Sequence, residues 1–185
     1  EVSPDSVTLL RTGCREWMSD CYPFDFELRL TYALTGGALR LTARVRNNGV
    51  RPMPHAFGWH PYFTTSKKSL ARLSVNMASC ERWGEAGKIA LPPEAIDLTD
   101  SADFVCRGRT GDMAEILSPG DGYGARIRSS EAFRALVVCA KFPGTTCVEP
   151  WMGLPDAINT RENLQWVDPG REAAYDCHIE PYLLG

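Results

Sequence analysis

The stretch FDFELRLTYALTGGALRLTARVRNNG, residues 24–49, carries apolar side chains at every second position on both sides of a short turn. A period of two is typical of β-strands that have one buried and one exposed face. We therefore expect strands over residues 24–34 and 39–45. Because TGGA at 35–38 supplies the glycine-rich turn that joins antiparallel strands, the whole stretch predicts a β-hairpin.

Shorter runs of apolar and β-branched residues predict further strands. They cover residues 73–77, 125–128, 135–142, 146–149 and 173–182. Turn sequences rich in Gly, Pro and Asp, such as PGDGYG, separate these runs, and no stretch has the apolar spacing of an amphipathic helix. The sequence therefore predicts the all-β class, an antiparallel β-sandwich with little helix, built from one domain over residues 1–185.

The composition limits the classes of partner. The chain has 185 residues, 44% of them hydrophobic, which is enough to bury the core of one domain. Its 23 acidic and 20 basic residues are scattered, so no basic patch predicts a nucleic acid or a membrane as partner. No apolar run reaches the roughly 18 residues that span a bilayer, and the first residues lack the pattern of a signal peptide. We expect a neutral partner, and, because no initiator Met is present, a fragment of a longer protein.

The seven cysteines are an odd number and include no CxxC pair. This spacing favours neither a disulfide framework nor a zinc site, so it predicts free thiols in a reducing cytoplasm and no bound metal. Cys139 and Cys177 lie in strand-like runs, where cysteine acts as a small apolar side chain, and we expect both to be structural.

The segment HAFGWHPYF, residues 55–63, contains two of the three histidines. A Gly and a Pro interrupt its strand pattern, so the chain is expected to bend where His60 lies. Imidazole titrates near neutral pH, which makes His60 a candidate proton donor; the alternative is a histidine that only hydrogen-bonds a loop. His55 would face the other side of an extended strand, and we expect it to be structural. His178 falls on the polar side of its strand and is expected to be solvated.

The segment TTCVEPWMGLPD, residues 145–156, places Glu149 where an apolar strand gives way to a loop. Strand ends are where a rigid scaffold presents functional groups, and partial burial raises the pKa of a carboxylate toward that of a useful base. The alternative is a glutamate that only fastens the loop. Trp151 follows two residues later, and an aromatic wall beside a few polar groups is typical of sugar pockets.

Taken together and in this order, GWHPYF and CVEPWMG resemble the site motifs of the aldose 1-epimerase (galactose mutarotase-like) family. The resemblance extends to YPFDFELRLTYAL before them and VDPGREAAYDCHI after them, from Tyr22 to Tyr182. It implies a galactose mutarotase-like supersandwich and an isomerase, free of cofactors, that interconverts the α and β anomers of an aldose. It also implies that an N-terminal portion is missing, with a histidine and an arginine that contact the sugar.

The resemblance also assigns roles to individual residues. His60 corresponds to the general acid of the family and Glu149 to the general base. Asp112, in GDMAEIL, is the counterpart of the family's aspartate that holds a sugar hydroxyl, and Trp151 is expected to contact the sugar.

Other functions remain open at this point. A carbohydrate-binding module without activity would use the same aromatic wall, including Trp59. A glycoside hydrolase would need two carboxylates, roughly 5 to 10 Å apart, rather than a histidine and a glutamate. A sugar-phosphate epimerase would need an arginine cluster at the pocket mouth. A structural interaction domain is the remaining alternative, and a strand pattern alone does not exclude it. The sequence does not predict the oligomeric state.

Overall fold

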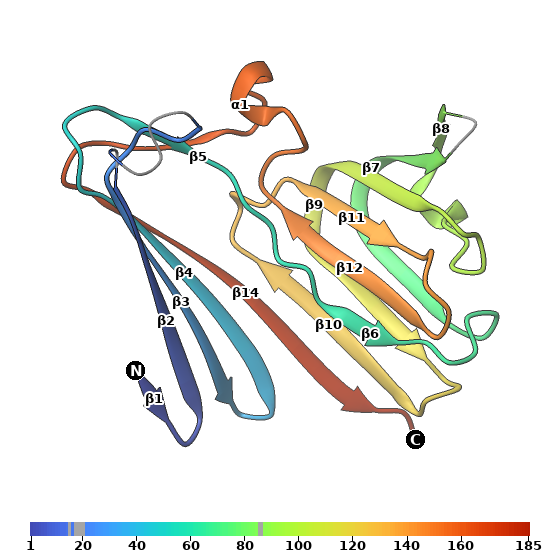
Figure 1. Cartoon of the computed structure of the whole chain (residues 1–185). Coiled ribbons are helices and arrows are strands. Elements are labelled where there is room, and N and C mark those ends of the chain that lie inside the picture. Colours follow the sequence, from blue (N-terminus) through green and yellow to red (C-terminus); the bar gives the residue numbers. More distant parts are fainter. Residues whose placement is uncertain (15, 17–20, 85–86) are drawn as a thin grey trace.

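The computed structural model describes residues 1–14, 16, 21–84 and 87–185. Figure 1 shows that these residues form antiparallel strands joined by turns and loops, with little helix. The strands are β1 (Val2–Ser3), β2 (Ser6–Gly13), β3 (Phe26–Thr35), β4 (Ala38–Asn47), β5 (Met53–His55), β6 (Tyr62–Thr64), β7 (Arg72–Gly84), β8 (Gly87–Leu91), β9 (Asp103–Ser118), β10 (Tyr123–Ser129), β11 (Ala135–Cys139), β12 (Thr145–Trp151), β13 (Gln165–Val167) and β14 (Glu172–Leu183). The helical elements are a single 3-10 turn, η1 (Pro93–Ala95), and the one-turn helix α1 (Ala157–Thr160).

The predicted hairpin is formed by β3 and β4, which pair antiparallel from Phe26↔Asn47 to Thr35↔Ala38. Gly36 and Gly37 both have positive φ, 58° and 83°. A two-residue turn with this backbone matches the right-handed twist of the flanking strands, and it favours glycine because other residues are strained there. The alternating pattern therefore predicted both strands and the turn between them.

The large sheet is antiparallel and runs in the order β1-β2-β3-β4-β14-β10-β9-β11-β12-β6, with β7 paired to β9 and β8, and β5 paired separately to β13. Four of the five further strands predicted from sequence lie within β7, β10, β12 and β14, and the fifth, predicted over residues 135–142, is β11, which already ends at Cys139. The strand β9 was not predicted, because its alternation is broken near Gly108, where φ is 72°. Next to Gly108, opposite residues 109–114 of β9, the pairing of β7 with β9 shifts register between Val75 and Met77, as at a β-bulge.

The irregular strand β9 joins two parts of the sheet. Residues 103–107 pair with β11, and residues 114–118 pair with β10. Buried side chains from both parts meet in one hydrophobic core, for example Val138 on β11 and Ile127 on β10. This arrangement confirms the predicted all-β antiparallel sandwich with little helix. Among the described residues, no helix is long and apolar enough to cross a bilayer.

One prediction about the cysteines is wrong. Cys80 on β7 and Cys106 on β9 lie opposite each other and form a disulfide, so the thiols are not all free. They are 26 positions apart in sequence, and only the register of the two strands brings them together. The disulfide removes the argument for a reducing compartment. Cys139 and Cys177 are buried, as predicted, and burial raises the pKa of the Cys177 thiol to about 12.

Candidate active site

The segment between β5 and β6 brings His60 to Glu149. It runs along β12 without forming a regular strand, and backbone hydrogen bonds hold it there. The amide of Trp59 donates to Pro150 O at 3.0 Å, and the amide of Met152 donates to Phe57 O at 3.0 Å. Two stretches that are distant in sequence therefore share one short piece of backbone pairing.

Gly58 permits this close approach. A Cβ atom at this position would lie 2.3 Å from Cδ1 of Trp151, and Gly58 forms an isolated β-bridge with that same residue. Two chain segments can pack at this distance only when one of them lacks a side chain. The close contact with Trp151 thus explains why a glycine precedes Trp59 and His60 in the motif.

Replacing Gly58 with Ala should therefore destabilise the protein by about 1–3 kcal/mol, the usual cost of overpacking. Thermal unfolding measures the loss. Gly111→Ala is the matched control, because its Cβ would meet Asn76 at 3.6 Å, an ordinary contact. Equal effects of the two substitutions would contradict the steric account of Gly58.

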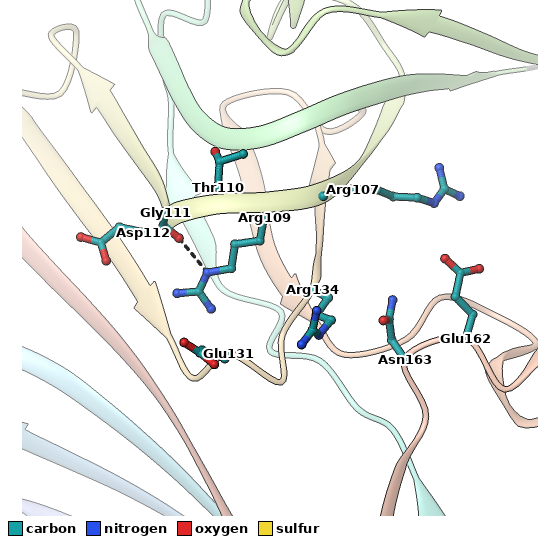
Figure 2. Close-up of a pocket in the computed structure, with 10 residues that line it drawn as sticks. Arg107, Arg109, Thr110, Gly111, Asp112, Glu131, Arg134, Glu162 and Asn163 are labelled. Carbon is teal, nitrogen blue, oxygen red and sulfur yellow. Dashed lines mark hydrogen bonds between the residues drawn. The ribbon is translucent and has the colours of Figure 1, made fainter.

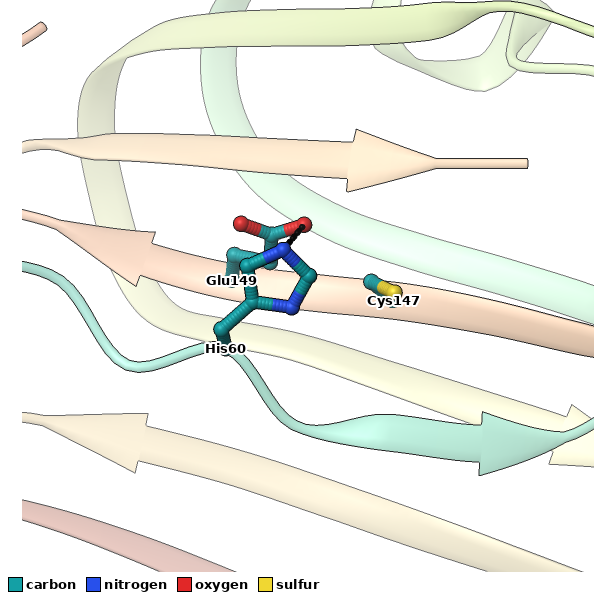
Figure 3. Close-up of side chains that lie close together, drawn as sticks. All are labelled: His60, Cys147 and Glu149. Atoms are coloured by element: carbon teal, nitrogen blue, oxygen red, sulfur yellow. Dashed lines mark ion pairs between the residues drawn. The ribbon is translucent and has the colours of Figure 1, made fainter. Parts of the chain in front are cut away.

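His60 and Glu149 form an ion-pair contact, with 3.3 Å between His60 Nε2 and Glu149 Oε1 (Figure 3). The other carboxylate oxygen, Oε2, accepts a hydrogen bond from Trp151 Nε1 at 3.0 Å. The Glu149 side chain is 2% exposed, whereas that of His60 is 50% exposed. A ligand arriving from solvent would therefore meet the imidazole first, with the carboxylate beneath it.

Burial raises the pKa of Glu149 above its ordinary value, because a carboxylate loses its hydration there. The nearby His60 and the hydrogen bond from Trp151 act in the opposite direction, and the charge of Asp103 adds to the increase. A carboxylate with a raised pKa is a stronger base than an exposed glutamate when it is ionised. The environment of Glu149 thus suits a proton acceptor.

Strand register places further groups on the face of the sheet that carries Glu149. Cys147 lies two residues earlier on β12, and residues two apart on a strand share a face. Cys147 lies opposite Cys139 on β11, and Cys139 lies opposite Asp103 on β9. Sequence reasoning missed both Asp103 and Cys147; the spacing of Cys147 from Glu149 was the available signal, whereas Asp103 required the register of three strands.

Trp151 and Trp59 differ in their surroundings. Trp151 is half-buried and, with His60, lines a hollow of about 300 Å³. Trp59 is buried in the hydrophobic core, with its ring edge-on to those of Tyr32 and Phe57. Of the two tryptophans, Trp151 is the one that lies directly beside the His60–Glu149 pair.

Asp112 lies elsewhere, on β9, where it is exposed and forms an ion pair with Arg128 at 3.0 Å. It borders a hollow of about 640 Å³ that has its own polar lining (Figure 2). The charged side chains around this hollow are Arg107, Arg109, Asp112, Glu131, Arg134 and Glu162. Asp112 lines neither of the two described hollows that His60 borders, so the structure does not bring it together with the His60–Glu149 pair.

His55 lies on β5, where its Nε2 is 3.0 Å from the hydroxyl oxygen of Tyr175. Burial lowers the pKa of His55 to about 4, so its ring is neutral near pH 7. It also borders an apolar hollow of about 510 Å³ that extends from His60 to the face of β3. His178 is half-buried on β14, opposite Arg40 and Arg128.

A sequence model of the family described as aldose 1-epimerase matches residues 5–96, which include the hairpin and His60. The predicted resemblance to the aldose 1-epimerase family is confirmed. The Escherichia coli K12 protein YphB, itself uncharacterized, is 24% identical to this aldose 1-epimerase-like chain over 149 residues. That match covers 72% of this chain and 51% of YphB.

Solved structures share the fold of this aldose 1-epimerase-like chain over nearly its whole length. Slr1438 from Synechocystis sp. PCC 6803 superimposes with a TM-score of 0.87 at 24% identity, covering 99% of this chain and 64% of that one. A galactose mutarotase-like protein from Clostridium acetobutylicum gives a TM-score of 0.80 at 14% identity, covering 100% and 65%. At these identities the similarity establishes the fold. The chain spans about half to two thirds of the lengths of these three relatives.

Proposed function

We propose that this protein is an aldose 1-epimerase that interconverts the α and β anomers of a neutral aldose without a metal or nucleotide cofactor. The observation that carries the proposal is the 3.3 Å contact between His60 Nε2 and Glu149 Oε1, beneath an exposed imidazole and beside Trp151. The family resemblance and the fold support the reaction class. In this proposal residues 1–185 act as one sugar-binding domain.

Mutarotation needs one base and one acid, which suits this pair. Glu149 takes the proton of the anomeric hydroxyl while His60 protonates the ring oxygen, and the hemiacetal opens to a free aldehyde. Rotation about the adjacent carbon–carbon bond then presents the other face of the carbonyl. As the ring closes, Glu149 returns its proton to the carbonyl oxygen, and His60 takes back the proton of the hydroxyl group that attacks the carbonyl carbon. A positioned proton-transfer group contributes roughly 10²- to 10⁴-fold to the rate.

The charge around the site favours a neutral sugar over a sugar phosphate, because no arginine or lysine lines either of the two described hollows that His60 borders. Three arginines line the polar hollow of about 640 Å³, but three carboxylates line it too. Arg107 is also paired with Glu81 at 3.0 Å, and Arg109 donates to the carbonyl oxygens of Gly111, Ser129 and Ser130. A phosphate would therefore meet no surplus of positive charge in this hollow.

A carbohydrate-binding domain without activity is the second candidate, favoured by the position of Trp151 at the edge of an open hollow. Such a domain has no use for a buried carboxylate with a raised pKa, because burying a charged group costs free energy. The Glu149 environment therefore favours catalysis over binding alone.

Polarimetry of freshly dissolved aldoses, with a chelator present, tests the proposal. We expect the protein to accelerate the change in optical rotation of at least one neutral hexose or pentose above the spontaneous rate, and to leave the matching 6-phosphates at that rate. A folded protein that binds an aldose in calorimetry but never accelerates its mutarotation would instead be the binding domain.

A further inference from the structure

Cys147 lies beside the proposed acid–base pair, and the proposed mechanism makes no use of it. One ligand atom each from His60, Cys147 and Glu149 lies within 4.8 Å of both others. In Figure 3 Cys147 and Glu149 project from one strand, and the His60 ring lies over them from the connection between β5 and β6. The three side chains thus offer a nitrogen, a sulfur and an oxygen to the same small volume.

The spacing suits a tetrahedral metal ion. Zinc bonds to N, O and S ligands of about 2.0 to 2.3 Å place neighbouring ligand atoms about 3.3 to 3.8 Å apart. His60 Nε2 and Glu149 Oε1 are already 3.3 Å apart, and no pair of the three ligand atoms exceeds 4.8 Å. Movements of about 1 Å or less would complete the geometry. Three protein ligands leave a fourth position for water, on the side where His60 is exposed.

Neighbouring residues hold two of the ligands in orientation. Trp151 Nε1 binds Glu149 Oε2, which leaves Oε1 directed at His60. The ring of Tyr62 stacks on that of His60, with 5.0 Å between centroids and 23° between planes. Outer contacts of this kind fix ligand geometry in metal sites. Asp103 adds negative charge on the same face of the sheet, although it is paired with Lys141 at 2.6 Å.

We propose that His60, Cys147 and Glu149 bind a zinc-class divalent cation, and that the bound cation inhibits the enzyme. The cation would occupy the imidazole nitrogen and the carboxylate oxygen that proton transfer requires. Binding displaces the proton of the Cys147 thiol to solvent. The mixed N, S and O ligands select zinc, cobalt or cadmium over Mg²⁺ and Ca²⁺, which require oxygen ligands. The inhibitory part of this inference rests on the proposed function, whereas the binding part does not.

Binding is tested first, without any sugar. Zn²⁺ is titrated calorimetrically into the wild type and Cys147→Ala, and Co²⁺ is added to each to record the thiolate-to-cobalt charge-transfer absorption. We expect one site in the wild type, with at least tenfold weaker affinity and no charge-transfer band at this site in Cys147→Ala. Cys177→Ala is the control, because Cys177 is buried on β14 and is not one of the three ligands. Its binding should match the wild type.

The inference is overturned if Cys147→Ala binds Zn²⁺ and Co²⁺ like the wild type, or if the wild type binds neither. Thermal unfolding shows whether Cys147→Ala is folded; Cys147→Ser replaces it otherwise, since a serine hydroxyl is a poor zinc ligand.

Inhibition is then measured as the ratio of mutarotation rates with and without Zn²⁺, taken for each variant against its own basal rate. We expect Zn²⁺ to lower the rate of the wild type and of Cys177→Ala at least tenfold, a chelator to restore it, and Mg²⁺ to have no effect. Zn²⁺ binding without any basal mutarotation would refute the proposed function and leave the metal site standing. Mutarotation that Zn²⁺ leaves unchanged would refute the inhibitory role.

Discussion

Replacing Glu149 with Gln is expected to lower kcat for mutarotation by roughly 10²- to 10⁴-fold, with a smaller change in KM. The amide keeps the size of the carboxylate and can still accept the hydrogen bond from Trp151 Nε1, but it cannot take up the anomeric proton. Polarimetry at saturating aldose gives kcat, and its dependence on aldose concentration gives KM. An unchanged kcat in a folded variant would contradict the role of Glu149.

The pKa of Glu149 provides the control for folding. Burial raises that pKa in the folded state, so the folded protein favours the protonated form. The cost in stability therefore grows as the pH rises from the unfolded value, 4.5, to the raised pKa, and it is absent below the unfolded value. Glu149→Gln should unfold at the same or a higher temperature than the wild type at pH 7, and its relative advantage should shrink toward pH 4.

Replacing His60 with Ala is expected to lower kcat by a similar factor, because the ring oxygen loses its proton donor. The half-exposed His60 side chain leaves a space that opens to solvent when it is removed. Added imidazole should therefore enter that space and restore part of the rate in His60→Ala, without accelerating Glu149→Gln. The comparison is made by polarimetry at constant pH and ionic strength, after subtracting the catalysis that imidazole alone provides.

Failure of imidazole to restore any rate in a folded His60→Ala variant would indicate that His60 acts by holding the segment 57–61 in place. In that case His60→Asn, which keeps a hydrogen-bonding side chain, should retain most of the activity. If His60 is the acid, His60→Asn should be as slow as His60→Ala.

The sequence predicted those elements that are specified by residues close to one another in the chain. The β3–β4 hairpin follows from alternation over 24–45 and from two adjacent glycines, because both features act within a few residues. The strand β9 was missed because Gly108 and the neighbouring register shift break its alternation. The Cys80–Cys106 disulfide was missed for a related reason: it depends on how β7 and β9 align, and nothing within either strand specifies that alignment.

The candidate site shows the same division. The motif resemblance singled out His60 and Glu149, and the structure brings them together through backbone contacts between the segment 57–61 and β12. It does not bring Asp112 to this pair. Asp103 instead lies across two strand pairings from Cys147, on the face that carries Glu149. A residue two strands away is found only from the strand register, which a single sequence does not encode in any short pattern.

The central claim is that His60 and Glu149 act as one acid–base unit, and a double-mutant comparison tests it most directly. The mutarotation rates of the wild type, His60→Asn, Glu149→Gln and the double variant are measured by polarimetry with one aldose at one pH. If the two groups act in the same step, either single substitution removes most of the catalysis, and the double variant is little slower than the singles. Independent effects would contradict the account. In that case the rate of the double variant would fall by the product of the factors measured for the two single variants.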